Sequence, residues 1–175
     1  LVNLLVFNVE SNAGVDKLRS LQILELLKAK VEYNKYISQI KKGIFTTQYQ
    51  RLQLLLLEIS HGGMLNVDSL IKQAHTSKFG NIYFGNDSSF LFNNTFQNSV
   101  LAYKILRQAG GNDLYLKSIR NYLLEMRRTG SWRNTYESST ILETILPDVI
   151  AGEEINNATL MINEDKNELF PVKKT

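Results

Sequence analysis

The chain has 175 residues, of which 43% are apolar and 10% aromatic, a composition typical of a globular protein with a core rather than of a disordered chain. The net charge is +3, and the 20 basic residues are spread along the sequence without a basic block, which excludes the usual signature of nucleic-acid binding. Cysteine is absent, which excludes disulfides, thiolate metal sites, a cysteine nucleophile and an internal thioester within these residues.

The two ends of the chain differ in pattern from its middle. Residues 1–12 are apolar but too short to span a bilayer, and Asn3 and Asn8 interrupt them, so we expect a connector or strand. Residues 13–152 carry helical patterns and are predicted to form one helical domain. Residues 153–175 form a tail with strand and turn character, and we expect the chain to be a piece of a longer protein.

The first half of the domain is predicted to contain four helices. Residues 14–30 are rich in leucine, and residues 31–43 place apolar side chains three and four positions apart before Gly43 ends the helix. Residues 46–63 carry leucine or isoleucine on almost every face, so this helix needs other helices around it. A short fourth helix is expected over residues 66–75.

The second half begins with an aromatic segment and continues as helices. Residues 81–84 (NIYF) and 90–92 (FLF) flank the turn residues GNDSS, so they could form a small hairpin or an ordered loop over a helical end. Helical patterns then resume in three segments, residues 94–111, 112–130 and 134–146. The last of these is expected to end before Pro147, because proline interrupts a helix.

Two of these segments share a pattern at an offset of forty residues. NTFQNSVLAYKIL starts at Asn94 and NTYESSTILETIL starts at Asn134. Each opens with asparagine at a plausible N-cap, followed three positions later by Gln97 or Glu137, which is a variant of the capping box. A period of about 40 residues predicts repeated helical hairpins, as in helical solenoids and toroids.

The stretch GSWRNTYESS, residues 130–139, is interpreted as a structural junction between helices. Trp132 is expected to be a packing anchor, because tryptophan at a helix junction usually fills a core. The same junction includes Asn134, Thr135 and Glu137, with Asn94 and Gln97 at the corresponding positions of the preceding repeat. Capping explains these residues without catalysis.

Aromatic side chains provide the best candidate for a binding surface. They are Tyr83, Phe84, Phe90 and Phe92. The alternative that they line the core is the more frequent outcome for clustered aromatic residues.

No catalytic residue, metal ligand or cofactor site is predicted. His61 and His75 have no further ligand at metal-binding spacing and are both interpreted as residues at helix C-termini. Glu137 and Glu143 lie six positions apart on one helix and therefore point in different directions. Ser138 and its neighbours have no histidine nearby to act as a base.

Two motifs resemble a known protein family. GSW followed by NTYESSTILETILP resembles the closing repeats of the thioester-containing domain of bacterial alpha-2-macroglobulin-like proteins. The segment IYFGNDSSFLFNNTFQNSVLAYKIL resembles the preceding repeat of that domain, so the resemblance covers about residues 80 to 150.

The resemblance implies a mainly α fold, an α/α toroid-like array of helical hairpins forming a complete or partial ring. It also implies that the short β-like tail leads into a β-rich neighbouring domain. Members of this family are large secreted or periplasmic protease traps, and some carry a Cys-Gly-Glu-Gln thioester. This sequence has no cysteine, so no functional residue is carried over. The chain is then a thioester-free member, or a piece without the part that holds the motif.

The leading functional hypothesis is therefore a non-enzymatic domain of a secreted or envelope protein that traps proteases. Its partners would be proteases or other domains of the parent chain, and membrane contact would come only through other parts of the parent. Two alternatives stay open, an α/α-toroid enzyme related to terpenoid cyclases or polysaccharide lyases, and a HEAT-like protein-binding solenoid.

Overall fold

The computed structural model describes residues 1–11, 15–43, 47–86, 94–110, 112–127, 132, 134–152, 159–162 and 165–168. Within these residues the protein is mainly helical, as the sequence predicts. The helices are α1 (Val2–Ser11), α2 (Val15–Leu26), α3 (Tyr33–Ile40), α4 (Gln48–Ser60), α5 (Val67–Ile71), α6 (Thr95–Ala109), α7 (Asp113–Glu125) and α8 (Thr135–Gly152). The strands are β1 (His75–Thr76), β2 (Ile82–Tyr83), β3 (Thr159–Ile162) and β4 (Asp165–Glu168).

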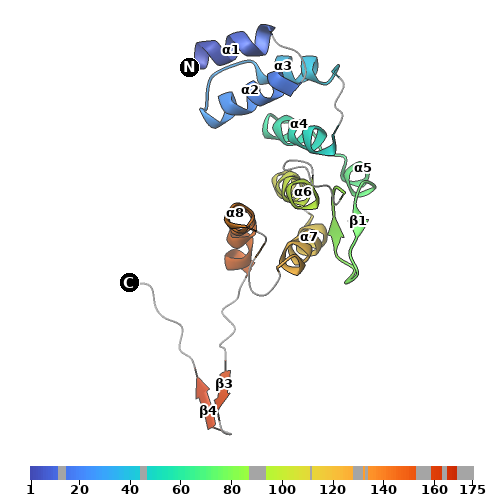
Figure 1. Cartoon of the computed structure of the whole chain (residues 1–175), viewed down its shortest axis with the longest axis vertical. Coiled ribbons are helices and arrows are strands. Elements are labelled where there is room, and N and C mark those ends of the chain that lie inside the picture. The colour runs from blue at the N-terminus through green and yellow to red at the C-terminus, as the bar shows by residue number, and fades with distance from the viewer. Residues whose placement is uncertain are drawn as a thin grey trace.

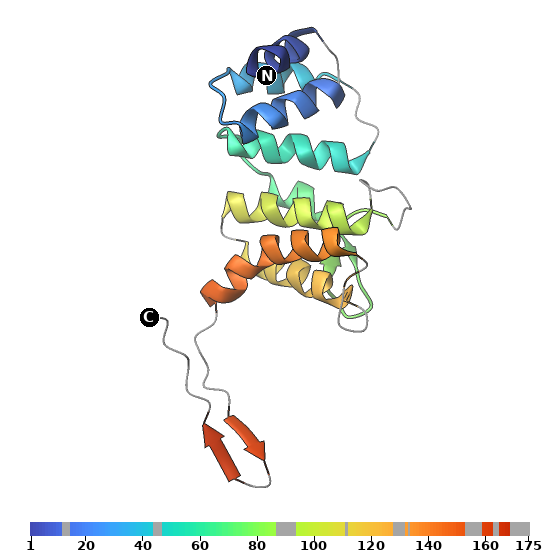
Figure 2. The same cartoon turned by 60° about the vertical axis from the view of Figure 1, so that its left-hand side comes forward.

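The helices form an elongated stack. In Figures 1 and 2, α2, α4, α6 and α8 follow one another along the long axis. In Figure 1, α5 and the β1–β2 hairpin lie to the right of α6, and α7 lies below it. Close contacts join neighbours in this order, with α1 on α2, α3 on α2 and α4, α4 on α6, and α6 on both α7 and α8. Because α1 and α8 lie at opposite ends, the described helices form an open stack and not a closed ring.

Helix α4 separates two hydrophobic cores. Leu52 and Ile59 belong to the core that α4 shares with α6, α7 and α8, whereas Leu54 and Leu57 belong to the core that it shares with α1, α2 and α3. A helix buried on two sides needs apolar residues around most of its circumference. The prediction of a helix surrounded by others within residues 46–63 is therefore confirmed for Gln48–Ser60.

The first helix corrects one prediction. Residues 1–12 were expected to be a connector or strand, but α1 occupies Val2–Ser11. Leu5 and Val9, one helical turn apart, are buried against α2. The segment is apolar on both faces, so its sequence has no clear period, and packing on α2 decides the helix.

The short elements after α4 also differ from their prediction. The expected helix over residues 66–75 ends at Ile71, and His75 lies in β1 instead of at a helix C-terminus. β1 pairs antiparallel with β2, with His75 opposite Tyr83. Residues 81–84 therefore use an upstream partner for their hairpin, and residues 90–92 lie outside the described residues.

Helix α8 does not stop at Pro147, so that prediction was wrong. Proline has no backbone N–H, and one hydrogen bond of the helix is therefore missing. The turn beyond it is held by Asp148, which accepts a hydrogen bond from Tyr103 of α6 and lies 3.1 Å from the Nε of Arg107. These contacts to α6 offset the lost backbone bond and let the helix continue to Gly152.

The strand character predicted for the tail is confirmed. β3 pairs antiparallel with β4, with Thr159 opposite Glu168 and Ile162 opposite Asp165. The β-rich neighbouring domain stays a prediction, since it would lie outside this chain.

Candidate functional site

A groove lies where α2, α4 and α6 meet. Its volume is about 560 Å³ and it is open to solvent. The lining residues come from all three helices and are Glu25, Leu26, Leu56, Ser60, Lys104, Arg107 and Gln108. Apolar and charged side chains thus face the same opening, although no local sequence motif marks any of them.

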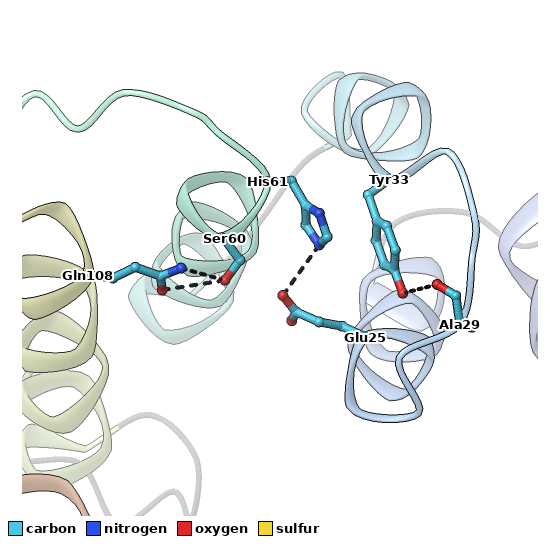
Figure 3. A network of polar contacts seen from close by, with 6 residues as sticks. All are labelled: Glu25, Ala29, Tyr33, Ser60, His61 and Gln108. Carbon is cyan, nitrogen blue, oxygen red and sulfur yellow. Dashed lines mark hydrogen bonds and ion pairs between the residues drawn. The ribbon is translucent and has the colours of Figure 1, made fainter.

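One wall of the groove is a polar contact between α4 and α6. The amide Nε2 of Gln108 donates to the Oγ of Ser60 at 3.1 Å. The Ser60 hydroxyl also lies 3.4 Å from the Oε1 of Gln108. Figure 3 shows the two side chains facing each other across the space between the helices. The contact joins successive helices of the stack.

A second polar contact joins α4 to α2 and α3. The imidazole of His61 stacks on the ring of Tyr33, with ring centroids 3.9 Å apart and an angle of 10° between the planes. Its Nε2 lies 3.3 Å from an Oε1 of Glu25, which is ion-pair distance when the ring is protonated, without the geometry of a hydrogen bond. The hydroxyl of Tyr33 donates to the carbonyl of Ala29. Burial, and then the charge of Glu25, raises the pKa of Tyr33.

Ser60 and His61 do not form a nucleophile–base pair. They are neighbours in sequence, but Figure 3 shows Ser60 directed to Gln108 and His61 directed to Glu25. Nucleophilic catalysis by serine requires a base within hydrogen-bond distance of the hydroxyl. His61 follows the last residue of α4 as its C-cap, so the prediction of a helix-terminal role is confirmed.

The contact between α6 and α8 is also polar and partly buried, with Tyr103 fully buried and Arg107 and Asp148 partly exposed. Asp148 binds both Tyr103 and Arg107, through different carboxylate oxygens. Burial, followed by the hydrogen bond to Asp148 and its charge, raises the pKa of Tyr103 well above the ordinary tyrosine range. The phenol therefore stays protonated and donates to the carboxylate.

The two predicted N-caps are present. Asn94 Oδ1 accepts from the backbone N–H of Gln97 at 3.0 Å, and Asn134 Oδ1 accepts from that of Glu137 at 2.8 Å. Thr135 is the first residue of α8, as Thr95 is of α6. The matching caps confirm that the two helices begin in the same way.

The other half of the capping box is not formed at Gln97. The Oε1 of this buried side chain has no hydrogen-bond partner. A buried amide oxygen without a partner costs free energy, because it has lost its hydrogen bonds to water. Gln97 is therefore a buried residue of α6 whose amide oxygen is unsatisfied.

Trp132 acts as a packing anchor. Its indole N–H donates to the backbone carbonyl of Leu123 near the end of α7 at 2.8 Å, and its ring packs against the core. The guanidinium of Arg127 lies over the ring, 5.6 Å from its centroid. These contacts join α7 to the start of α8, as expected for a junction.

The structure describes two of the four aromatic residues that were considered as a binding surface. Tyr83 is half-buried and stacks on Tyr122, with ring centroids 4.6 Å apart. Phe84 is fully buried and its backbone N–H donates to Ser99, so the alternative of a core position is confirmed for this residue and it is not part of a binding surface. Phe90 and Phe92 lie outside the described residues.

We compared the chain with known protein families, curated proteins and solved structures, and none of them matched. Within the described residues, no helix is long and apolar enough to cross a membrane. No cluster of three potential metal ligands occurs in that same part of the chain.

Proposed function

We propose that the chain is a non-catalytic helical-repeat module that binds a protein partner. The observation that carries this proposal is the use of its polar side chains. Ser60 joins α4 to α6, His61 joins α4 to α2 and α3, and Asp148 joins α8 to α6. Groups that would otherwise be candidates for chemistry hold neighbouring helices together, as in a stacked repeat protein.

The groove between α2, α4 and α6 is the proposed contact site. Leu26 is 82% exposed at its edge, and Leu56 adds a second apolar side chain. Glu25 and Lys104 provide opposite charges within the same opening. An open groove with this mixture fits a segment of a protein with apolar and charged side chains.

A more specific form of the proposal follows from the resemblance to bacterial alpha-2-macroglobulin-like proteins. In this form the module belongs to a secreted or envelope protein that traps proteases sterically. The caps at Asn94 and Asn134 and the junction at Trp132 support it, because these are residues on which the resemblance rests. The partner would be a protease or another domain of the same protein.

The α/α-toroid enzyme is less favoured by the placement of its candidate acids. Glu137 is buried and Glu143 is exposed, and they lie on different sides of α8. Tyr136 is 52% exposed and its ring lies edge to face against Phe96 of α6. General acid–base catalysis needs such groups to converge on one substrate atom.

The test uses the full-length protein that contains this chain, incubated with a broad-specificity protease. Cleavage of a large protein substrate and of a small chromogenic peptide is then measured. We expect the first to fall and the second to persist, because a trapped protease still admits small substrates. Equal retention of both activities would remove the trapping proposal.

The groove is tested by charge reversal in the same assay. Lys104→Glu changes an exposed lysine in the groove, and Lys117→Glu changes an exposed lysine on α7 as the matched control. We expect Lys104→Glu to weaken trapping and Lys117→Glu to leave it unchanged. Equal effects of the two variants would show that the groove is not the contact site.

A further inference from the structure

One face of α8 is apolar and exposed. Leu142 and Leu146 are each 44% exposed and Ile150 is 66% exposed, and these residues recur every four positions, so they share one face. Tyr136 adds a ring that is 52% exposed near the start of the helix. These four residues are here called the α8 face, and α8 is the last helix of the stack (Figure 2).

The opposite side of α8 packs on the stack. Glu137, Ile141 and Ile145 are buried there, in line with the contacts between α6 and α8. The exposure of the α8 face is therefore not a property of the whole helix. For Leu142, Leu146 and Ile150 it is confined to the side that points away from α6, whereas the Tyr136 ring at the start of the helix also touches Phe96 of α6.

The forty-residue repeat assigns a role to the α8 face. The residues of α6 that correspond to Tyr136, Leu142 and Leu146 are Phe96, Ala102 and Leu106. All three are fully buried, at 0% exposure. They lie in the helix on which α7 and α8 pack, and Phe96 touches Tyr136 edge to face at 6.3 Å.

We infer that the α8 face is a stacking surface that binds a helical hairpin of a second protein. The hairpin would pack on α8 as the α7–α8 hairpin packs on α6 and would continue the stack. This inference rests on the helical-repeat part of the proposed function and is independent of the groove and of protease trapping.

Charge defines the chemistry of this hairpin. Glu143 is exposed on α8 at the position that corresponds to Tyr103, whose hydroxyl donates to Asp148. Helix α8 contains acidic residues and neither lysine nor arginine. The incoming helix therefore needs a cation or hydroxyl donor opposite Glu143, and apolar residues on the same face.

Two copies of the chain packed through their α8 faces, or α8 face on α1, fit this requirement poorly. Two α8 faces packed together would bring Glu143 close to its own counterpart, and like charges repel. Helix α1 exposes Leu4 and Phe7, but it contains no lysine or arginine. Neither α1 nor α8 has a lysine or arginine that could pair with Glu143.

The test is an extended chain in which residues 112–152 are repeated directly after Gly152. The added copy carries Asp148→Lys, which places a cation opposite Glu143 of the original α8. We expect the melting temperature to rise by at least about 4 °C in a single transition, because an apolar interface is filled. A separate second transition, or an unchanged melting temperature, would overturn the inference.

Substitutions in the original α8 test whether the rise in melting temperature depends on the α8 face. Leu142→Glu with Leu146→Glu should abolish the rise in the extended chain and shift the unextended chain by less than about 2 °C, because both side chains are already 44% exposed there. Leu124→Glu on α7, at a leucine that is 43% exposed, is the matched control and should preserve the rise. A rise that survives the double substitution would contradict the inference.

Two further measurements test whether the α8 face is covered by a second copy of the chain or by residues 153–175. Sedimentation of the unextended chain should show a monomer, and a dimer that Leu142→Glu dissociates would assign the face to a second copy. A chain ending at Gly152 should melt at the same temperature as the full chain. A fall that Leu142→Glu reproduces would assign the face to residues 153–175. Either result would overturn the assignment to a second protein.

Discussion

The hydroxyl of Tyr103 donates a hydrogen bond to the carboxylate of Asp148, and the two residues join α6 to α8 one residue beyond Pro147. Tyr103 is fully buried, and Arg107 lies on the other carboxylate oxygen at 3.1 Å. The pair therefore lies next to the point in α8 where proline, which has no N–H, leaves one backbone hydrogen bond unmade. It holds the second half of α8 against the stack.

Tyr103→Phe should lower the free energy of unfolding by about 2 kcal/mol, because a buried hydrogen bond to a charged acceptor is lost. Urea denaturation followed by circular dichroism measures this change. Tyr115→Phe is the control, since Tyr115 is exposed on α7 and should show almost no effect. Equal losses in the two variants would contradict the importance of the Asp148 contact.

Stability should also fall in alkaline solution. The pKa of Tyr103 is raised in the folded protein, first by burial and then by Asp148, whereas an unfolded tyrosine titrates near pH 10. The stabilisation is complete below about pH 10 and is lost as the pH rises toward the folded pKa, because only the unfolded chain ionises readily. Tyr33, Tyr36 and Tyr49 have pKa values raised in the same direction and add to the effect.

Urea midpoints measured between pH 8 and pH 11 check this dependence. The midpoint should decrease above about pH 10, and Tyr103→Phe should decrease less steeply than the parent protein. A Tyr103→Phe variant with the same alkaline slope as the parent would show that Tyr103 does not contribute.

The two N-caps should differ in their contribution to stability. The Asn94 side chain is buried, with 4% exposure, whereas Asn134 is exposed. Asn94→Ala should therefore cost about 2 kcal/mol and Asn134→Ala about 1 kcal/mol or less. Asn134→Ser should restore most of the loss at that position, because serine also accepts from the helix N-terminus. A larger loss at Asn134 than at Asn94 would contradict the burial argument.

Replacement of Gln97 by methionine should stabilise the protein. The Oε1 of Gln97 is buried without a hydrogen-bond partner, and methionine has a similar length and no amide. We expect Gln97→Met to raise the free energy of unfolding by about 1 kcal/mol. Gln108→Met is the contrasting variant, because it removes the contact to Ser60 and should not stabilise. A destabilised Gln97→Met variant would mean that the amide is satisfied in solution.

Local sequence determined the helices and their caps. Asn94 and Asn134 bind backbone groups only three residues away, so both N-caps can be predicted without knowledge of the fold. The 3.6-residue period likewise predicted α3, α6 and α7, since each needs an apolar stripe to face the stack. Helix α4 was predicted from apolar residues on almost every face, because it is buried on two sides. Composition and the absence of cysteine also excluded disulfides and thiolate sites.

Tertiary structure alone decided the course of α1, the length of α8 and the groove. Ser60 and Gln108 are 48 positions apart, and Tyr103 and Asp148 are 45 positions apart. No local pattern encodes such pairs, because their energy depends on which helices the stack brings together. One consequence is that α8 continues past Pro147. The contacts of Asp148 to α6 offset the backbone hydrogen bond that proline cannot make. The exposed α8 face is another consequence, because the same apolar pattern is buried in α6 and uncovered in α8 according to which helix packs on it.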